Sequence, residues 1–463
     1  MGVAHGGLSV VAALLLGAGC ATHRLAREGD AYMEAGRATL AVRCYRQACE
    51  RRPSKGELQL SLARAYLADA QPQEAEAPAR RALSLEEPGA GLALAEALIR
   101  TGRTDEGATL IEAAKGGDAE DPAVLDLTAL LQLAHHDPAA SETQRRAYDL
   151  APTSRREASL AWLLARAGAN EVAGETAHHV LDSGTPDPDA LGDAAAALLL
   201  AGDEAGARAA AREVQSYVAD ISDRWREQAA HAQQAADSEG ALRLLARVAS
   251  LHPQDGTLLG QLGLMFNDLG DVHHAAQFLE AALASDTFRA TWEQVSADQR
   301  GAAVATMGFQ NDEAARLGSA LAEVRLAQGR TADAAHALRA SLIVGGSPTA
   351  EAWERVAATF EQAREWAAAV DAAGQAVRLD PAALGALLIL TRIYRGAGDL
   401  GQAIGYARMA WRAAPGEPRV ALVLGELYEL RGEPSAAREL YLEALRLAPD
   451  LPPLRAALQR VER

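Results

Sequence analysis

Lysine, aromatic residues and cysteine are all scarce in this sequence of 463 residues. Only 2 of the 45 basic residues are lysine, 4% of all residues are aromatic, and there are three cysteines. Three cysteines exclude a disulfide-framework protein, and glycine and proline without a short period exclude a collagen-like one. Because strands are built mostly from aromatic and β-branched residues, their shortage argues against a fold based on β-sheets.

Alanine and acidic residues are what the sequence has in excess. It contains 108 alanines, and alanine is the strongest intrinsic helix former. The 62 acidic residues outnumber the basic ones and give a net charge of −17. Such a chain would be repelled by nucleic-acid phosphates and by anionic lipid. The composition therefore predicts an acidic, all-α protein that does not bind nucleic acid.

No apolar run is long enough to span a bilayer, which takes about 20 residues. The run Leu8–Leu16 has the length of a signal-peptide core and is followed by small residues and then Cys20. This arrangement resembles a bacterial lipoprotein signal. The resemblance implies that residues 1–19 are removed, that Cys20 is acylated, and that Ala21, in place of Asp, goes with delivery to the outer membrane. An ordinary cleaved signal peptide, with Cys20 incidental, is the alternative.

Cys44 and Cys49 are the other two cysteines. They lie five residues apart in a segment predicted to be helical, which puts them roughly 140° apart around the helix axis. A disulfide between them would require the backbone to bend. We predict that both are half-buried thiols of one helix.

Most of the chain repeats itself with a period of 34 residues. Pro381, Pro415 and Pro449 mark the period, and similar phrases precede them (AVRLDP, AWRAAP, ALRLAP). The last unit adds residues at further fixed positions, namely Leu424, Gly425, Tyr428, Gly432, Ala437, Tyr441 and Ala444. This pattern resembles the tetratricopeptide repeat, whose units are hairpins of two antiparallel helices, A and B. The resemblance implies a right-handed α-α superhelical solenoid of about twelve repeats.

Two positions of every unit hold small residues when the repeats start near residues 22, 56, 88, 121, 154, 188, 222, 256, 315, 350, 384 and 418. Helix axes pack about 8–10 Å apart, so the closest crossings admit only small side chains. On helix B this position reads Ala41, Ala75, Gly107, Ala140, Ala173, Ala207, Ala241, Ala275, Ala334, Ala369, Ala403 and Ala437. On helix A it reads Gly29, Ala63, Ala95, Thr128, Ala161, Ala195, Ala229, Gly263, Ala322, Ala357, Thr391 and Gly425.

The repeats define the predicted domain organisation. Repeats 1–8 occupy residues 20–289, an insertion follows over 290–314, repeats 9–12 occupy 315–451, and a capping helix covers 452–463. The insertion arises because the step between the repeat starts at 256 and 315 is longer than one repeat.

Trp292 and Phe309 in the insertion are candidate partner-binding residues, because insertions in repeat proteins are often binding elements. Packing of these side chains on the neighbouring repeat is the alternative.

The A helices of the last repeats carry a strip of charged residues. Glu361, Arg395 and Glu429 share one helix position, and Arg392 and Glu426 share another. Residues 34 apart lie side by side in such a solenoid, so the strip would line the concave face. It would bind a partner segment, since arginine offers paired hydrogen bonds to carboxylates. A ladder of ion pairs between repeats is the alternative.

No catalytic or cofactor-binding motif is found. The sequence has no G-x-S-x-G, H-E-x-x-H, G-x-x-x-x-G-K-[ST] or C-x-x-C pattern. Three pairs of adjacent histidines occur at different repeat positions. Neighbours on a helix point about 100° apart, so one pair does not easily hold a metal ion. We predict no metal, no cofactor and no enzymatic activity.

The two resemblances together predict a lipoprotein scaffold anchored to the outer membrane and facing the periplasm. Its concave groove would hold peptide segments or helices of envelope proteins, with the membrane contacted only through the lipid. Lipoproteins of this kind assist pilus, secretion, polysaccharide-export or gliding-motility machines. The Lys and Asn set with which some tetratricopeptide domains clamp a C-terminal carboxylate is absent. A soluble periplasmic adaptor, for example of cell-wall enzymes, is the alternative.

Overall fold

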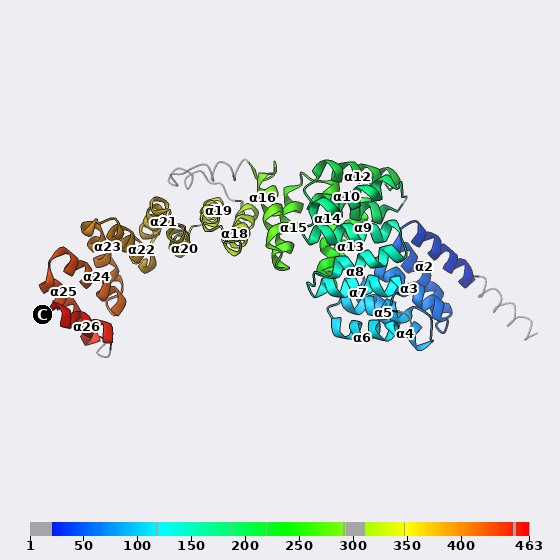
Figure 1. Ribbon diagram of the computed structural model, residues 1–463, viewed down its shortest axis with the longest axis horizontal. Coiled ribbons are helices and arrows are strands. Elements are labelled where there is room, and N and C mark those ends of the chain that lie inside the picture. The colour runs from blue at the N-terminus through cyan, green and yellow to red at the C-terminus, as the bar shows by residue number, and fades with distance from the viewer. Residues whose placement is uncertain are drawn as a thin grey trace, which may run out of the picture. The chain divides into compact units, whose positions relative to one another are not determined.

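The computed structural model describes residues 21–116, 119–185, 187–218, 220–289, 292, 311–346, 348–447 and 451–462. Over these residues the regular structure is helical and no strand occurs (Figure 1), which confirms the predicted all-α class. The chain divides into two compact units, Met1–Pro253 and Gln254–Arg463. The boundary lies between predicted repeats 7 and 8.

Unit 1 holds seven helical hairpins within the described residues. The first pairs a helix over 21–34 with α2 (Ala38–Arg51). The other six pair α3 (Gly56–Ala68) with α4 (Pro72–Ser84), α5 (Ala90–Arg100) with α6 (Thr104–Lys115), α7 (Pro122–Ala134) with α8 (Ala140–Leu150), α9 (Ser154–Arg166) with α10 (Asn170–Asp182), α11 (Pro188–Leu200) with α12 (Glu204–Tyr217), and α13 (Ile221–Gln234) with α14 (Ser238–Leu251).

Unit 2 holds five more hairpins within the described residues, followed by a single helix, α26 (Pro452–Val461). The total of twelve hairpins agrees with the predicted repeat number. The pairs are α15 (Gly256–Asp268) with α16 (Val272–Ala284), α18 (Asp312–Ala327) with α19 (Thr331–Val344), α20 (Ala350–Gln362) with α21 (Trp366–Leu379), α22 (Leu384–Gly396) with α23 (Leu400–Ala413), and α24 (Pro418–Arg431) with α25 (Pro434–Leu447).

Small residues lie where the helices cross, as the sequence pattern predicts. All eleven alanines at the helix-B position are at most 5% exposed. At Gly425 on α24, an added Cβ would lie 2.1 Å from the ring of Tyr441 on α25. The two helices of a hairpin therefore approach until backbone meets side chain, and a larger residue at either position would push them apart.

The turn from helix A to helix B uses the left-handed backbone conformation. Glycine provides it at Gly432, with φ of 80° after α24. Ala70, His136, Ala236 and Arg364 adopt the same conformation without glycine, with φ between 54° and 61°. A side chain in this region costs roughly 1–2 kcal/mol. At these four turns the packing of the two helices imposes the backbone geometry.

The structure describes more of the end of the array than of the predicted insertion. α26 packs on α24 and α25 and buries Leu454 and Ala457 against them. α18 begins at Asp312, so the last three residues of the predicted insertion are helical. Most of the insertion lies outside the described residues.

Two further findings concern the cysteines and the membrane. Cys44 and Cys49 are free thiols, half-buried and buried respectively, and burial raises the pKa of Cys49 to about 11. In the part of the chain that the structure describes, none of the helices has the length and hydropathy needed to cross a bilayer.

We expect Ala403→Leu on α23 to lower the free energy of unfolding by about 1–3 kcal/mol, because it overpacks a helix crossing. Chemical denaturation followed by circular dichroism measures the change. Arg412→Leu on the same helix is the matched control, since Arg412 is exposed, and it should be nearly neutral. Equal losses in the two variants would contradict the repeat register.

Candidate protein-interaction faces

Where helices of the same kind meet between neighbouring repeats, they are mainly the first helices of the hairpins. Contacts join α3 with α5, α5 with α7 and α9 with α11 in unit 1, and α15 with α18 and α20 with α22 in unit 2. The A helices therefore line the concave side of each array, which we call its inner face. Helical-repeat proteins use this side as an extended binding surface.

The predicted charge strip on the inner face of unit 2 forms a ladder of ion pairs. Arg392 donates from Nε and Nη2 to Glu361, at 2.8 and 2.6 Å. In the next step, Nη1 of Arg395 lies 3.5 Å from Glu426. Each pair joins the twelfth residue of one repeat to the ninth residue of the next, so it links two neighbouring A helices.

The capping helix supplies the last pair of this ladder. Arg460 on α26 donates to Glu429 at 3.0 and 2.9 Å, and the hydroxyl of Tyr441 donates to the same carboxylate at 2.7 Å. The hydrogen bond from Arg460 is the main reason that the pKa of Glu429 is lowered. The order of charge alternates along the array, from Glu–Arg to Arg–Glu and back to Glu–Arg.

These ion pairs leave part of each arginine at the surface. The side chains of Arg392 and Arg395 are 48% and 40% exposed. The structure thus brings together Arg392, Arg395, Glu426 and Glu429 as the inter-repeat ladder. Their contact with a partner segment stays a prediction.

Of the other predicted site residues, only Trp292 lies in the described part of the chain. Its ring lies against α18 at Gly318, where an added Cβ would be 2.4 Å from Cη2 of the indole. This is the local packing that the sequence left open as the alternative to partner binding. Phe309 and Cys20 lie outside the described residues.

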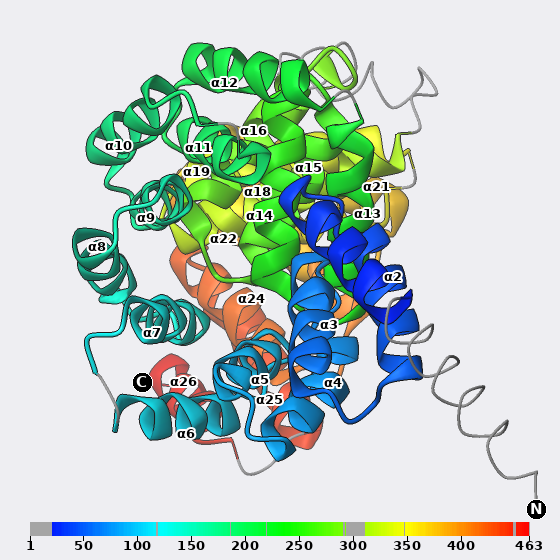
Figure 2. The same ribbon diagram turned by 90° about the vertical axis from the view of Figure 1, so that its right-hand side faces the viewer.

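Part of the inner face of unit 1, at α9 and α11, is occupied by the chain itself. α14 packs on α11 and α12, where regular stacking of repeat 7 would place α13. Figure 2 shows α14 inside the arc that α3 to α12 follow. Every residue of Ala190–Leu200 on α11 is buried, and Trp162 on α9 is 1% exposed. In repeat 7 the second helix, α14, therefore takes the place beside α11 and α12 that the first helix would hold in a regular stack.

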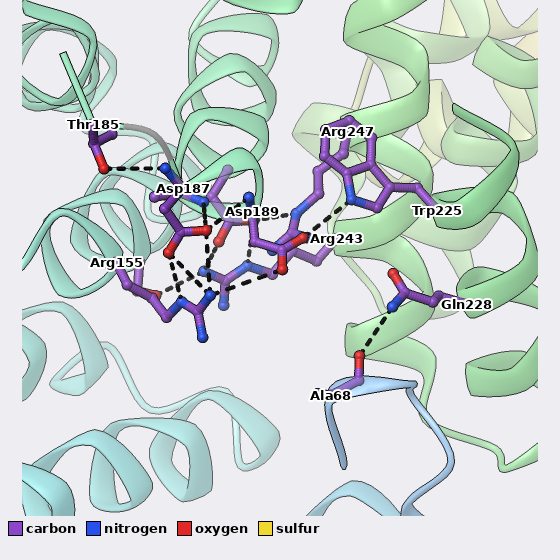
Figure 3. A network of polar contacts seen from close by, with 12 residues as sticks. Ala68, Arg155, Thr185, Asp187, Asp189, Trp225, Gln228, Arg243 and Arg247 are labelled. Atoms are coloured by element: carbon purple, nitrogen blue, oxygen red, sulfur yellow. Dashed lines mark hydrogen bonds and ion pairs between the residues drawn. The ribbon is translucent and has the colours of Figure 1, made fainter. Parts of the chain in front are cut away.

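Charged side chains join α14 to the A helices that it covers (Figure 3). Arg243 donates to Asp193 on α11 at 2.9 Å and to the hydroxyl of Ser159 on α9 at 2.7 Å. Arg247 donates from Nε to Asp193 at 2.6 Å and from Nη1 to Asp189 at 2.8 Å. Asp193 is 1% exposed, so two guanidinium groups pair with a fully buried carboxylate.

The two arginines keep this carboxylate ionised. Burial alone would raise the pKa of Asp193, but Arg243 and Arg247 lower it to about 2. Burial acts on Asp189 in the same way, and Arg247 is the largest of the causes that lower its pKa. Trp225 on α13 donates from Nε1 to Asp189 at 3.2 Å, and the guanidinium of Arg247 lies over the Trp225 ring, 5.5 Å from its centre.

Acidic residues at the start of α14 are compensated less fully. Asp237 caps the helix by accepting from the amide of Gly240 at 2.8 Å, while its Oδ2 is buried with no hydrogen-bond partner among the described residues. Glu239 accepts from Arg166 on α9 at 2.8 Å. Burial raises the pKa of both Asp237 and Glu239. The burial of carboxylates is therefore compensated more fully around the middle of α14 than at its first turn.

α13 joins the last hairpin of unit 1 to the beginning of the unit. Gln228 donates to the carbonyl of Ala68 at 3.0 Å (Figure 3), and Nδ1 of His231 lies 3.3 Å from the carbonyl of Asp69. Ala68 is the last residue of α3, and Asp69 begins the turn to α4. Unit 1 thereby closes on itself, with the seventh hairpin in contact with the second.

The residues that fill the inner face of unit 1 were not among the predicted site residues. A signal was present, because Asp189 and Asp193 are four residues apart, as are Arg243 and Arg247. At this spacing each pair lies on one face of its helix. The sequence does not show that α14 covers α11, because repeat 7 has small residues at the same positions as the other repeats.

Two of the three histidine pairs make polar contacts with acidic residues. His178 lies 2.9 Å from Asp203, and His274, at the start of α16, lies 2.8 Å from Asp271. Within the described ranges, no group of three His, Cys, Asp or Glu residues is arranged to hold a metal ion.

Comparison with known proteins identifies the repeats. Family models described as tetratricopeptide repeat match residues 27–91, 319–383 and 394–461. These three segments are tetratricopeptide repeats, and they lie in both units. Comparison with curated proteins finds no match to this sequence.

Solved structures resemble the chain in fold, at low identity. The crystal structure of YrrB, titled a TPR protein with an unusual peptide-binding site, is 14% identical, with a TM-score of 0.33 over 46% of this chain and 97% of that one. The crystal structure of MamA is 20% identical, with a TM-score of 0.30 over 41% and 95%. The APC/C hetero-tetramer Cut9-Hcn1 is 12% identical, with a TM-score of 0.32 over 98% and 89%.

Two isosteric substitutions test the charges around α14. Asp193→Asn should cost about 3–5 kcal/mol of stability at neutral pH, because it leaves two arginines without their buried carboxylate. Asp237→Asn makes the same chemical change where no arginine pair is lost, so it should change stability by less than about 1 kcal/mol. Denaturant unfolding of the two variants measures both values.

The pH dependence gives a second measurement. The stabilisation from Asp193 is fully present above its ordinary pKa of 3.8 and is lost as the pH falls through about 2. Asp193→Asn should therefore flatten the acid limb of the stability curve, and Asp237→Asn should not. Similar curves for the two variants would contradict this account.

Proposed function

We propose that the protein is a non-enzymatic tetratricopeptide lipoprotein, anchored to the outer membrane, that binds segments of envelope proteins and so assembles or stabilises a multi-protein envelope machine. A pilus, a secretion system, a polysaccharide-export channel or a gliding-motility complex is the kind of machine meant. The proposal is supported by the tetratricopeptide repeats at 27–91, 319–383 and 394–461 and by the signal-like segment that ends at Cys20.

The difference between the two inner faces is the observation that carries the binding part of the proposal. In unit 1 the inner face at α9 and α11 is covered by α14, and both Trp162 and the length of α11 are buried. On unit 2 the ladder arginines keep much of their surface exposed. A partner segment would therefore bind along the A helices of unit 2, from α20 to α24, where guanidinium and carboxylate groups are accessible.

We expect a photo-crosslinking residue at Leu388, on the inner face of α22, to capture the partner in the envelope. The same residue at Glu439, exposed on helix B of the last repeat, is the matched control and should capture none. Recovery of the same partner from both positions would argue against binding along the inner face.

A charge exchange separates partner binding from ladder stability. In the double variant Glu361→Arg with Arg392→Glu, the ion pair is kept but its two charges change places. Stability should stay within about 1 kcal/mol of the native protein, because exposed pairs contribute no more than that. Capture at Leu388 should still fall strongly, because the partner meets the opposite charges. If the double variant captured the partner as well as the native protein does, Glu361 and Arg392 would stabilise the array without contacting the partner.

The anchoring part of the proposal is tested by Cys20→Ser. Acylation at Cys20 predicts that the native protein incorporates labelled palmitate and sediments with outer membranes, and that Cys20→Ser is soluble and unlabelled. Cys44→Ser is the matched control and should behave like the native protein. A native protein found in the soluble periplasmic fraction would support the soluble adaptor instead.

A further inference from the structure

The first hairpin is basic within an acidic protein. The whole chain has a net charge of −17, yet residues 21–55 contain eight Arg and Lys against four Asp and Glu. The overall charge would repel an anionic surface, whereas this hairpin would be attracted to one.

The hairpin brings the start of the described chain next to the end of α2. The helices over 21–34 and Ala38–Arg51 run antiparallel through a short turn. Their register is set by the hydroxyl of Tyr45, which donates to Asp30 at 2.6 Å. Counting outward from this pair, residue 21 lies at the same end of the hairpin as the last residues of α2.

That end of the hairpin carries a group of exposed basic side chains, which we call the anchor-end face: Arg24, Arg51, Arg52 and Lys55. Arg51 and Arg52 have no ion-pair partner among the described residues. Arg24 lies 3.4 Å from Glu28 and Lys55 lies 2.7 Å from Glu57, but these carboxylates are themselves exposed. Such pairs are weak in water and leave the cations available.

Residue 21 is already helical, so no linker separates the hairpin from Cys20. A helix rises 1.5 Å per residue, which puts Arg24 about 4.5 Å along the axis from Ala21, the residue that follows Cys20 in the sequence. The Debye length in physiological salt is about 8 Å. Charges at this end would lie within the electrostatic reach of a membrane surface that holds Cys20.

We propose that the anchor-end face docks on anionic lipid headgroups beside the acyl chains of Cys20, and that this contact holds the first hairpin against the membrane. The inference rests on the acylation in the proposed function. Acyl chains combined with a basic patch give firmer membrane binding than a single chain does. Docking at this end would also fix the direction in which unit 1 leaves the membrane.

The test uses the full-length Cys20→Ser chain without its lipid and sedimentation with vesicles. We expect it to bind vesicles that contain phosphatidylglycerol at low salt, to be released by added salt, and not to bind vesicles of phosphatidylcholine alone. Replacing Arg24, Arg51, Arg52 and Lys55 with Gln should weaken binding at least about tenfold, because each basic residue near such a surface contributes to attraction.

The matched control replaces four exposed arginines of unit 2, Arg378, Arg412, Arg419 and Arg446, with Gln. It makes the same change in net charge and should bind like its parent. Equal weakening in the two variants would overturn the proposal, and so would a parent chain that does not bind the vesicles. Binding of the parent chain to isolated cell-wall sacculi but not to vesicles would also overturn it. Circular dichroism of both variants checks that each is folded. Because the chain carries no lipid, vesicle binding can succeed even where palmitate labelling of the native protein fails, so the two proposals fail separately.

Discussion

The close approach of two helices at small residues is the constraint on which this structure depends. At Gly425 the side chain of Tyr441 already fills the space that a Cβ would need, and the eleven alanines at the helix-B position are buried. With the distance within each hairpin fixed, the hairpins become similar bodies that stack. Each repeat then buries its apolar surface against its neighbours, because it cannot do so alone.

This constraint explains how far the sequence predicts the structure. The small residues recur in every unit, so the helices, their pairing and the number of hairpins follow from them. They say less about how one hairpin meets the next. Repeat 7 keeps its small residues, Ala229 and Ala241, both buried, and yet its second helix covers α11. The placement of α14 depends on contacts between residues 50 or more apart, such as Arg243 with Asp193, which no local pattern contains.

The candidate site was also predicted only in part: its residues were found, but not their pairing. The residues of the charge strip follow from the repeat period, and the structure brings them together. The paired residues do not occupy equivalent positions of their repeats. Arg392 is the ninth residue of its repeat and pairs with Glu361, the twelfth residue of the repeat before it. The period gives equivalent positions 34 residues apart, but the offset between neighbouring A helices decides which side chains meet.

The scarcity of lysine is consistent with how basic residues are used. Arg247 pairs with Asp193 and Asp189 at once and lies over the ring of Trp225. A guanidinium can donate in several directions and stack on an aromatic face, whereas an ammonium group is a compact, strongly hydrated charge. Buried pairs of this kind therefore favour arginine.

The alternating charges of the ladder limit how the end of the array can change in length. The repeat from α22 presents two arginines, Arg392 and Arg395, and the repeat from α24 presents two glutamates, Glu426 and Glu429. Loss of the last repeat alone would set Arg395 against Arg460 of the capping helix. Loss of both repeats together would set Glu361 against Arg460 and restore attraction. Duplication or deletion at this end is thus electrostatically matched only in steps of two.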